Sequence, residues 1–211
     1  MKTMPVPNKT ALLFALYALV CTGLVAITYQ ATATRIIDNE KQRLLNQLFS
    51  LVPADQIDND PSEDLITLTN TSELGTSEPV TVYRARRAGK NFAAIFATQS
   101  HQGYNGRIRL LVAIDQHGKL IGIKTVSHKE TPGLGDKIES NRSDWAEQFV
   151  NKSLVDPQPQ FWKVKKDGGQ FDQLTGATIT PRAIVKTVLL TLRYFDSHQS
   201  ELFAGETQHE S

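Results

Sequence analysis

The stretch FDQLTGATITPRAIV, residues 171–185, combines hydroxyls and small side chains in an order that suits an anionic group. Thr175, Gly176, Ala177 and Thr178 directly precede an amphipathic helical pattern. Unpaired backbone N–H groups and the helix dipole favour an anion at such a position, and small residues let a bulky group approach the backbone. Composition alone favours a hydroxyl-rich turn that binds nothing, so both interpretations stay open.

A second loop, ETPGLGD at residues 130–136, is rich in glycine and directly follows His128-Lys129. The pattern fits a Pro-Gly turn as well as a loop whose backbone comes close to a ligand. GLGDKI at residues 133–138 begins like a dinucleotide fingerprint, but Ile138 occupies its last position and no βαβ pattern surrounds it. The five histidines lack metal-ligand spacing. The sequence therefore predicts no metal site and no catalytic residue.

The segment DQLTGATIT, residues 172–180, resembles the flavinylation motif D-x-x-[S/T]-G-A-T of the FMN-binding domain family. The resemblance implies FMN joined through a phosphoester to the hydroxyl of Thr178. Asp172 matches the leading acid, which a separate flavin transferase needs to install FMN. Thr175 matches the Ser/Thr position, and Gly176 with Ala177 matches the small pair. Gln173 stands where many members have a small residue, which loosens the match without touching the acceptor.

The wider pattern is similar to the G subunit of Rnf-type ion-translocating electron transport complexes, and to the related C subunit of the sodium-translocating NADH:quinone reductase. The similarity includes GYNGRIRLLVAID, HKETPGLGDKI and KKDGGQFDQLTGATITPRA. It implies a flavoprotein that relays electrons to membrane and redox subunits of the complex while the complex moves ions. It also implies that the glycine-rich loop holds the flavin ring through Glu130, Thr131, Gly133, Leu134 and Gly135.

Other side chains have both a flavin-related and an ordinary interpretation. Tyr104, Trp145 and Trp162 either lie against the ring or belong to the core. Lys165 and Lys166 either neutralise the phosphate or form a solvated basic pair.

Two alternative functions stay open. The first is an anchored scaffold or assembly protein that never acquires flavin. The second is a periplasmic enzyme with loosely bound FMN that acts on a small substrate of its own. Neither a substrate-pocket motif nor a nicotinamide site is visible in the sequence, which favours a relay without independent catalytic activity.

The elements that position these residues are four strand-like runs and two helices. Short turns separate the runs at residues 81–87, 91–100, 107–115 and 120–128, so we expect antiparallel neighbours. A short helix follows, with Ser143 or Asp144 as its cap. The last helix is predicted to begin with Thr180 as N-cap and Pro181 at the first helical position. The predicted class is α+β: a twisted antiparallel sheet with packed helices, preceded by one N-terminal transmembrane helix.

The N-terminal part carries no charge from Thr10 to Thr34, which is long enough for the roughly 20 residues of a membrane-spanning helix. Lys2 and Lys9 precede it, so the positive-inside tendency predicts a single-pass anchor with a cytoplasmic N-terminus and the residues after about 34 across the membrane. The resemblance implies that this membrane is the inner membrane and that the C-terminal domain is in the periplasm. ATA at residues 31–33 resembles a signal-peptidase site, but signal-peptide apolar cores are shorter than this run.

Length, charge and cysteine content limit the possible partners and covalent links of this chain. The chain has 211 residues, 23 basic and 22 acidic, so a nucleic-acid partner is not expected. Its single cysteine, Cys21, cannot form an intrachain disulfide. The predicted layout is a short cytoplasmic N-terminus at 1–9, an anchor at 10–30, a membrane-proximal helix and leading segment at 31–74, the FMN-binding domain at 75–203 and a flexible tail at 204–211.

Overall fold

The computed structural model describes residues 9–204, apart from the side chain of Thr34. The short N-terminus and the tail predicted above fall almost wholly outside these residues. The chain divides into two compact units, Met1–Leu44 and Leu45–Ser211.

The first unit is formed by helix α1, Lys9–Phe49, whose last residues belong to the second unit. It joins the predicted anchor and the predicted membrane-proximal helix in one element. The hydroxyls of Thr22, Thr28 and Thr32 donate to carbonyls four residues earlier, at 2.6, 2.7 and 2.8 Å. These bonds pair the threonine hydroxyls within the helix itself, which is what a membrane-spanning segment requires of its polar groups. Among the described residues, α1 is the one helix long and apolar enough to cross a membrane.

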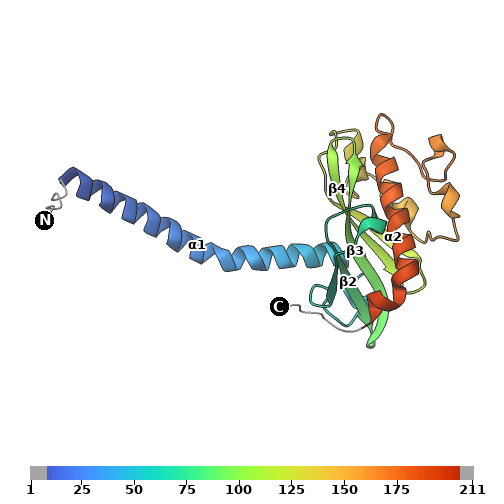
Figure 1. Ribbon diagram of the computed structural model, residues 1–211, viewed down its shortest axis with the longest axis horizontal. Helices are drawn as coiled ribbons and strands as arrows, with labels where there is room; N and C mark the ends of the chain where they lie inside the picture. The colour runs from blue at the N-terminus through green and yellow to red at the C-terminus, as the bar shows by residue number, and fades with distance from the viewer. Residues whose placement is uncertain (1–8, 205–211) are drawn as a thin grey trace. The chain divides into compact units, whose positions relative to one another are not determined.

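The second unit contains a five-stranded antiparallel sheet in the order β1-β2-β3-β4-β5 (Figure 1), which confirms the predicted fold class. The strands are β1 (Leu65–Leu68), β2 (Val80–Arg87), β3 (Lys90–Gly103), β4 (Gly106–Asp115) and β5 (Leu120–Ser127). Four of them match the predicted runs to within a few residues. The long β3–β4 pair brings the turn at Gly103–Gly106 to one end of the sheet.

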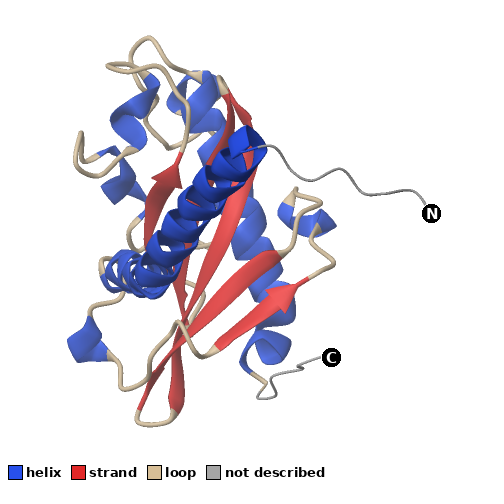
Figure 2. Cartoon of the chain, turned by 90° about the vertical axis from the view of Figure 1, so that its left-hand side faces the viewer, coloured by secondary structure: helices blue, strands red, loops and turns tan. Residues whose placement is uncertain are grey.

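Helix α2, Ile179–Phe203, covers one face of this sheet (Figures 1 and 2). Side chains in strands alternate between the two faces, and the core between the sheet and α2 is built mainly from apolar, buried residues. Phe96 of β3 meets Tyr194 and Phe195 of α2 edge-on, with ring centroids 6.4 Å apart in both pairs. The other buried residues of this core include Val82, Ala94, Ile108, Leu110, Val112, Ile184, Val188 and Leu192.

The chain between β5 and α2 contains four short 3-10 helices: η3 (Gly135–Ile138), η4 (Trp145–Phe149), η5 (Pro159–Phe161) and η6 (Lys165–Asp167). An aromatic cluster holds this region together. Phe171 stacks on Phe149 at 4.8 Å and lies 4.7 Å from Trp162, centroid to centroid. Trp145 Nε1 donates to the Asp172 carbonyl at 2.7 Å. The cluster therefore fixes where the hydroxyl-rich turn begins.

Two predictions of helix starts need correction. Thr180 is not the N-cap of α2, because the helix begins at Ile179 and the Thr180 hydroxyl is buried and bonded elsewhere. Pro181 accordingly lies within the first turn and not at the first helical position. The short helix after the glycine-rich loop is the 3-10 helix η4. Ser143 Oγ accepts from the Trp145 N–H at 3.2 Å, whereas Asp144 makes no side-chain cap.

Candidate functional site

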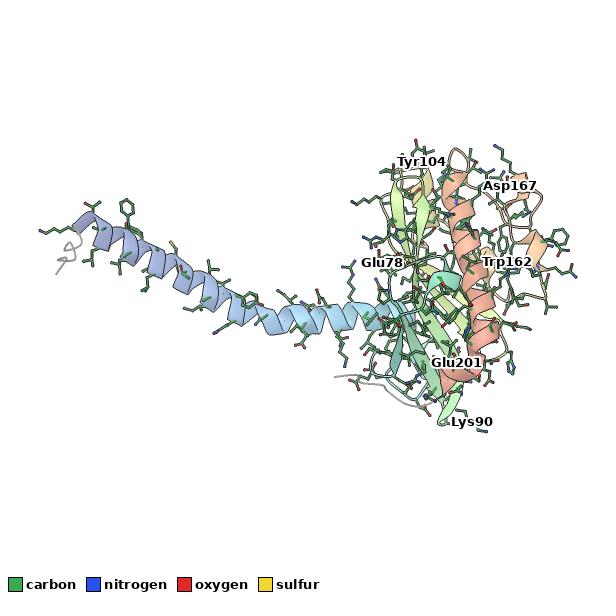
Figure 3. All side chains as sticks on the ribbon, viewed as in Figure 1. Glu78, Lys90, Tyr104, Trp162, Asp167 and Glu201 are labelled. Carbon is green, nitrogen blue, oxygen red and sulfur yellow. The ribbon has the colours of Figure 1, made fainter. Side chains whose placement is uncertain are left out.

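A cavity of about 410 Å³ lies where the β3–β4 turn, the loop after β5 and the first turn of α2 meet. Tyr104 is at this end of the domain, opposite the β2–β3 turn at Lys90 (Figure 3). The three segments are far apart in sequence, and the sheet register and α2 bring them together. The lining residues are Tyr104, Glu130, Thr131, Leu134, Gly135, Gly176, Ala177, Thr178, Ile179 and Thr180.

Most residues selected from the sequence fall on this one cavity. Both predicted segments, the glycine-rich loop and the hydroxyl-rich turn, contribute to its walls. Gly133, Thr175 and Asp172 lie outside the lining. Ile179 and Thr180 line it without having been predicted as site residues. Tyr104 was open to a core interpretation in the sequence, although the GYNG turn around it is a visible signal of a tight hairpin.

Glu130 is the buried acidic residue of the lining, with 4 % of its surface exposed. Its Oε1 accepts from the Asn105 N–H at 3.1 Å, and its Oε2 accepts from the Tyr104 N–H at 3.3 Å. The Thr180 hydroxyl also donates to Oε2. Three donors from two other segments therefore converge on one carboxylate, as buried charge requires.

Three glycines allow this close packing. A β-carbon at Gly103 would lie 2.8 Å from Glu130 Oε1, and one at Gly135 would lie 2.9 Å from Glu130 Cβ. A β-carbon at Gly176 would lie 2.9 Å from Leu134 Cδ2, and Gly176 also has φ +81°. Glycine at these positions lets the loop after β5 lie directly on the hairpin turn and on the turn before α2.

The threonines of the motif have different environments. Thr175 is exposed, and the Thr180 hydroxyl is bonded to Glu130. Thr178 lines the cavity, is partly buried, and stands immediately before α2 without capping it through its side chain. Among the described threonines of this motif, Thr178 alone combines a place in the cavity wall with a hydroxyl not bonded to Glu130.

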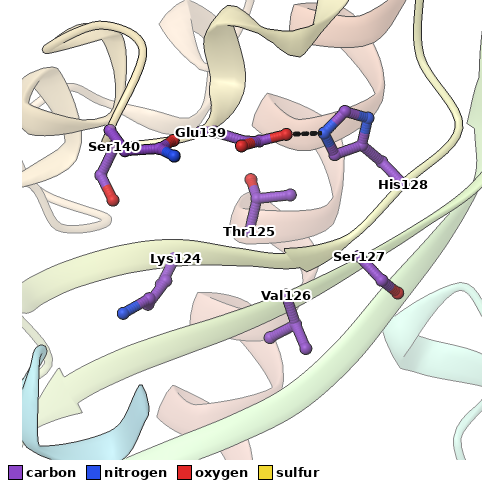
Figure 4. Close-up of a pocket in the computed structure, with 8 residues that line it drawn as sticks. Lys124, Thr125, Val126, Ser127, His128, Glu139 and Ser140 are labelled. Atoms are coloured by element: carbon purple, nitrogen blue, oxygen red, sulfur yellow. Dashed lines mark hydrogen bonds and ion pairs between the residues drawn. The ribbon is translucent and has the colours of Figure 1, made fainter. Parts of the chain in front are cut away.

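His128 is hydrogen-bonded to the main chain of the glycine-rich loop. Its Nδ1 accepts from the Glu130 N–H at 3.0 Å, so its ring proton is on Nε2, which donates to Glu139 Oε1 at 2.7 Å (Figure 4). This hydrogen bond lowers the pKa of Glu139; burial opposes the shift, and Arg142 adds to it. His128 and Glu139 line a second cavity, of about 470 Å³, beside β5.

The other side chains considered from the sequence lie outside the first cavity. Trp145 and Trp162 are buried in the aromatic cluster. Lys165 Nζ pairs with Asp172 Oδ1 at 2.6 Å, and both side chains are more than half exposed. Lys166 is exposed and does not line the cavity.

The chemistry of this lining is that of a binding site. Within residues 9–204 no cluster of three potential metal-ligating His, Cys, Asp or Glu residues exists. The one carboxylate in the lining is already bonded to three donors. A mixed apolar and hydroxyl-bearing surface with a helix start suits a flat apolar ring that carries an anionic group.

Comparison with known proteins agrees with this description. Residues 103–192, which include every residue that lines the cavity, match the family model of the FMN-binding domain. Residues 4–51 match the model of the RnfG N-terminal region.

Curated relatives match along nearly the whole chain. The G subunit of the ion-translocating oxidoreductase complex of Shewanella oneidensis is 45% identical over 196 residues, which cover 93% of this chain and 92% of the relative. The proteins of the same name from Vibrio cholerae and Pseudomonas aeruginosa are each 44% identical, over 92% and 94% of this chain and 93% and 92% of their own. The chain, with its FMN-binding domain, therefore belongs to the family of G subunits of ion-translocating oxidoreductase complexes.

Proposed function

We propose that this protein relays electrons through FMN attached to the Thr178 hydroxyl by a phosphoester, within a complex that couples electron transfer to ion translocation across the inner membrane. The observation that carries the proposal is the environment of Thr178. This residue lies in the wall of the cavity, next to the start of α2, while Thr180 is bonded to Glu130 and Thr175 lies outside the lining.

The lining fits a flavin in size and in character. Leu134, Ile179 and Tyr104 offer apolar and aromatic surface, and all three are well exposed. Gly135 and Gly176 provide backbone that a ring can approach closely. The N-terminus of α2 supplies unpaired N–H groups and a dipole that favour a phosphate on Thr178. The flavin would supply the redox chemistry, and the protein its position and electrostatic environment.

Attachment needs a separate enzyme, because a threonine hydroxyl is a poor nucleophile without a base. Glu130 is the one carboxylate in the lining, and it already accepts three hydrogen bonds. We propose a flavin transferase that uses FAD. The bond from the Thr178 oxygen to the FMN phosphorus forms, the pyrophosphate bond of FAD breaks, AMP leaves, and the hydroxyl proton is released. Asp172 is exposed and outside the cavity, which suits recognition by that enzyme.

The helix α1 gives the proposed relay its location. We propose that it is a retained anchor with the FMN-binding domain in the periplasm, since Lys2 and Lys9 precede the apolar run. Anchoring would keep the flavin at a high effective concentration near the membrane and redox subunits of the complex.

The test is fluorescence of the denatured protein on a gel under ultraviolet light, after co-expression with the transferase. Wild type and Thr178→Ser should fluoresce, and Thr178→Ala should not, while Thr175→Val controls for loss of a neighbouring hydroxyl. Fluorescence of Thr178→Ala would rule out this acceptor. A native protein that binds flavin but loses it on denaturation would support loosely held FMN, and one without flavin in an active complex would support a scaffold.

A further inference from the structure

Glu130 lines the cavity, but its carboxylate is buried and hydrogen-bonded to other parts of the protein. Four lone-pair sites are available on a carboxylate. The N–H groups of Tyr104 and Asn105 and the hydroxyl of Thr180 occupy three of them. The space around both oxygens is also closed, because β-carbons at Gly103 and Gly135 would lie 2.8 and 3.2 Å from Oε1 and Oε2.

We propose that Glu130 is a positioning residue that locks the β3–β4 turn and the first turn of α2 onto the glycine-rich loop, and so sets the shape of the flavin cavity. This role rests on the proposed function, but it differs from the direct flavin contact that the sequence suggested. Hydrogen bonds to a charged acceptor are stronger than those between neutral groups, so one carboxylate can hold all three walls.

Tyr104 shows why such a lock is needed. Its side chain is 65% exposed, so packing against the core does not fix its direction. The β3–β4 pairing places this turn at the end of the sheet, and the bonds from the N–H groups of Tyr104 and Asn105 to Glu130 join it to the glycine-rich loop. On the other side, Thr180 fixes the helix turn that directly follows Thr178.

His128 connects Glu130 to a further residue, Glu139. Its Nδ1 accepts from the Glu130 N–H, and its Nε2 is held by Glu139. The main chain of Glu130 is therefore fixed from one side of the loop, and its side chain is bonded on the other.

The first experiment needs no flavin. The full chain is produced without the transferase, and hydrogen exchange of the Tyr104 and Asn105 amides is measured. In Glu130→Gln one acceptor oxygen becomes an NH2 group, so at least one of the two amides should exchange about tenfold faster or more. Glu147→Gln, the same change at an exposed glutamate outside the cavity, should leave both amides at the wild-type rate. Unchanged exchange in Glu130→Gln would overturn the proposal.

The second experiment uses the flavinylated protein and a pair of substitutions at Thr180. Thr180→Val removes the donor and keeps the shape, while Thr180→Ser restores the hydroxyl. We expect Glu130→Gln and Thr180→Val to change the visible circular dichroism and the midpoint potential of the bound flavin. Thr180→Ser should stay at wild-type values. The double variant Glu130→Gln/Thr180→Val should show less than the sum of the two single effects, because both substitutions affect the Thr180–Glu130 hydrogen bond.

The outcomes separate this inference from the proposed function. If wild-type protein carries no flavin on Thr178, the proposed function fails, whatever the exchange rates show. If wild type is flavinylated and Glu130→Gln and Thr180→Val lower the melting temperature but leave the flavin signals unchanged, Glu130 only stabilises the fold and the positioning role is wrong. Thr180→Val keeps the charge and the volume, so it provides this test even if Glu130→Gln does not fold.

Discussion

The hydroxyl of Thr180 donates to the carboxylate of Glu130 across fifty residues of sequence. This bond joins the first turn of α2 to the loop that follows β5, and both segments line the same cavity. A residue that looks like an ordinary helix cap in the sequence is thus part of a tertiary contact. The site depends on how these segments are held together as much as on the residue that would carry the cofactor.

Gly176 and Gly133 offer a matched comparison of backbone strain and crowding. Both have positive φ, +81° and +78°, but only a β-carbon at Gly176 meets a neighbour, Leu134. Gly133→Ala should lower the free energy of unfolding by about 1–2 kcal/mol from backbone strain alone. Gly176→Ala should cost about 1–3 kcal/mol more, because it also overpacks against Leu134.

Urea unfolding of the full chain in detergent measures both effects. Adding Leu134→Ala to Gly176→Ala should recover part of the extra cost, since it removes the crowded side chain. Equal costs for the two alanine variants would contradict the observed packing of Leu134 on Gly176.

Asp172 should affect the rate at which the transferase attaches the flavin more than the environment of the attached flavin. The carboxylate is 61% exposed and paired with Lys165 outside the cavity. Asp172→Asn should slow flavinylation by the transferase, while any flavinylated fraction should have the wild-type visible circular dichroism. Lys165→Met should leave the rate unchanged, and either variant should change the free energy of unfolding by less than about 1 kcal/mol, because the ion pair is at the surface. A changed flavin spectrum in Asp172→Asn would place this carboxylate at the ring instead.

Glu139 should titrate below the usual range of glutamate. The hydrogen bond from His128 lowers its pKa, so His128→Ala should raise the pKa of Glu139 toward its ordinary value. Because the pKa of the folded state is the lower one, the interaction stabilises fully above the unfolded-state pKa and is lost as the pH falls through the folded-state pKa.

Carbon-detected NMR of the side-chain carboxyl gives the pKa, and urea unfolding at several acidic pH values gives the linked stability. Glu139→Gln should remove this part of the acid dependence. An unaltered Glu139 pKa in His128→Ala would show that the hydrogen bond does not control it.

Phe171 should be essential for placing the turn that carries Thr178. Its ring stacks on Phe149 and is fully packed, whereas Phe161, in the same region, is 39% exposed. Phe171→Ala should lower the free energy of unfolding by about 3–5 kcal/mol. Phe161→Ala should cost less than Phe171→Ala, because part of the Phe161 surface is already exposed. Thermal unfolding of the two variants side by side checks the difference, and similar losses would contradict the role of the aromatic cluster.

Local patterns in the sequence predicted the sheet well. Alternating apolar residues and short turns predicted β2 to β5, and the apolar run from Thr10 predicted the first part of α1. The short helix around Trp145 follows the prediction, although it has 3-10 geometry. The sequence does not predict the 3-10 helices η3, η5 and η6, because such short elements follow tertiary packing and not periodicity. Glycine and threonine motifs indicated most of the cavity lining. Thr180 was assigned wrongly, since a cap and a long-range hydrogen bond use the same kind of residue.

The most direct test of the proposed function is the intact mass of the protein purified from its native membranes, followed by mass spectrometry of the peptide that contains Thr178. We predict an added FMN less one water, located on the Thr178 oxygen and missing from Thr178→Ala. An unmodified Thr178 in a complex that transfers electrons at its full rate would contradict the proposal.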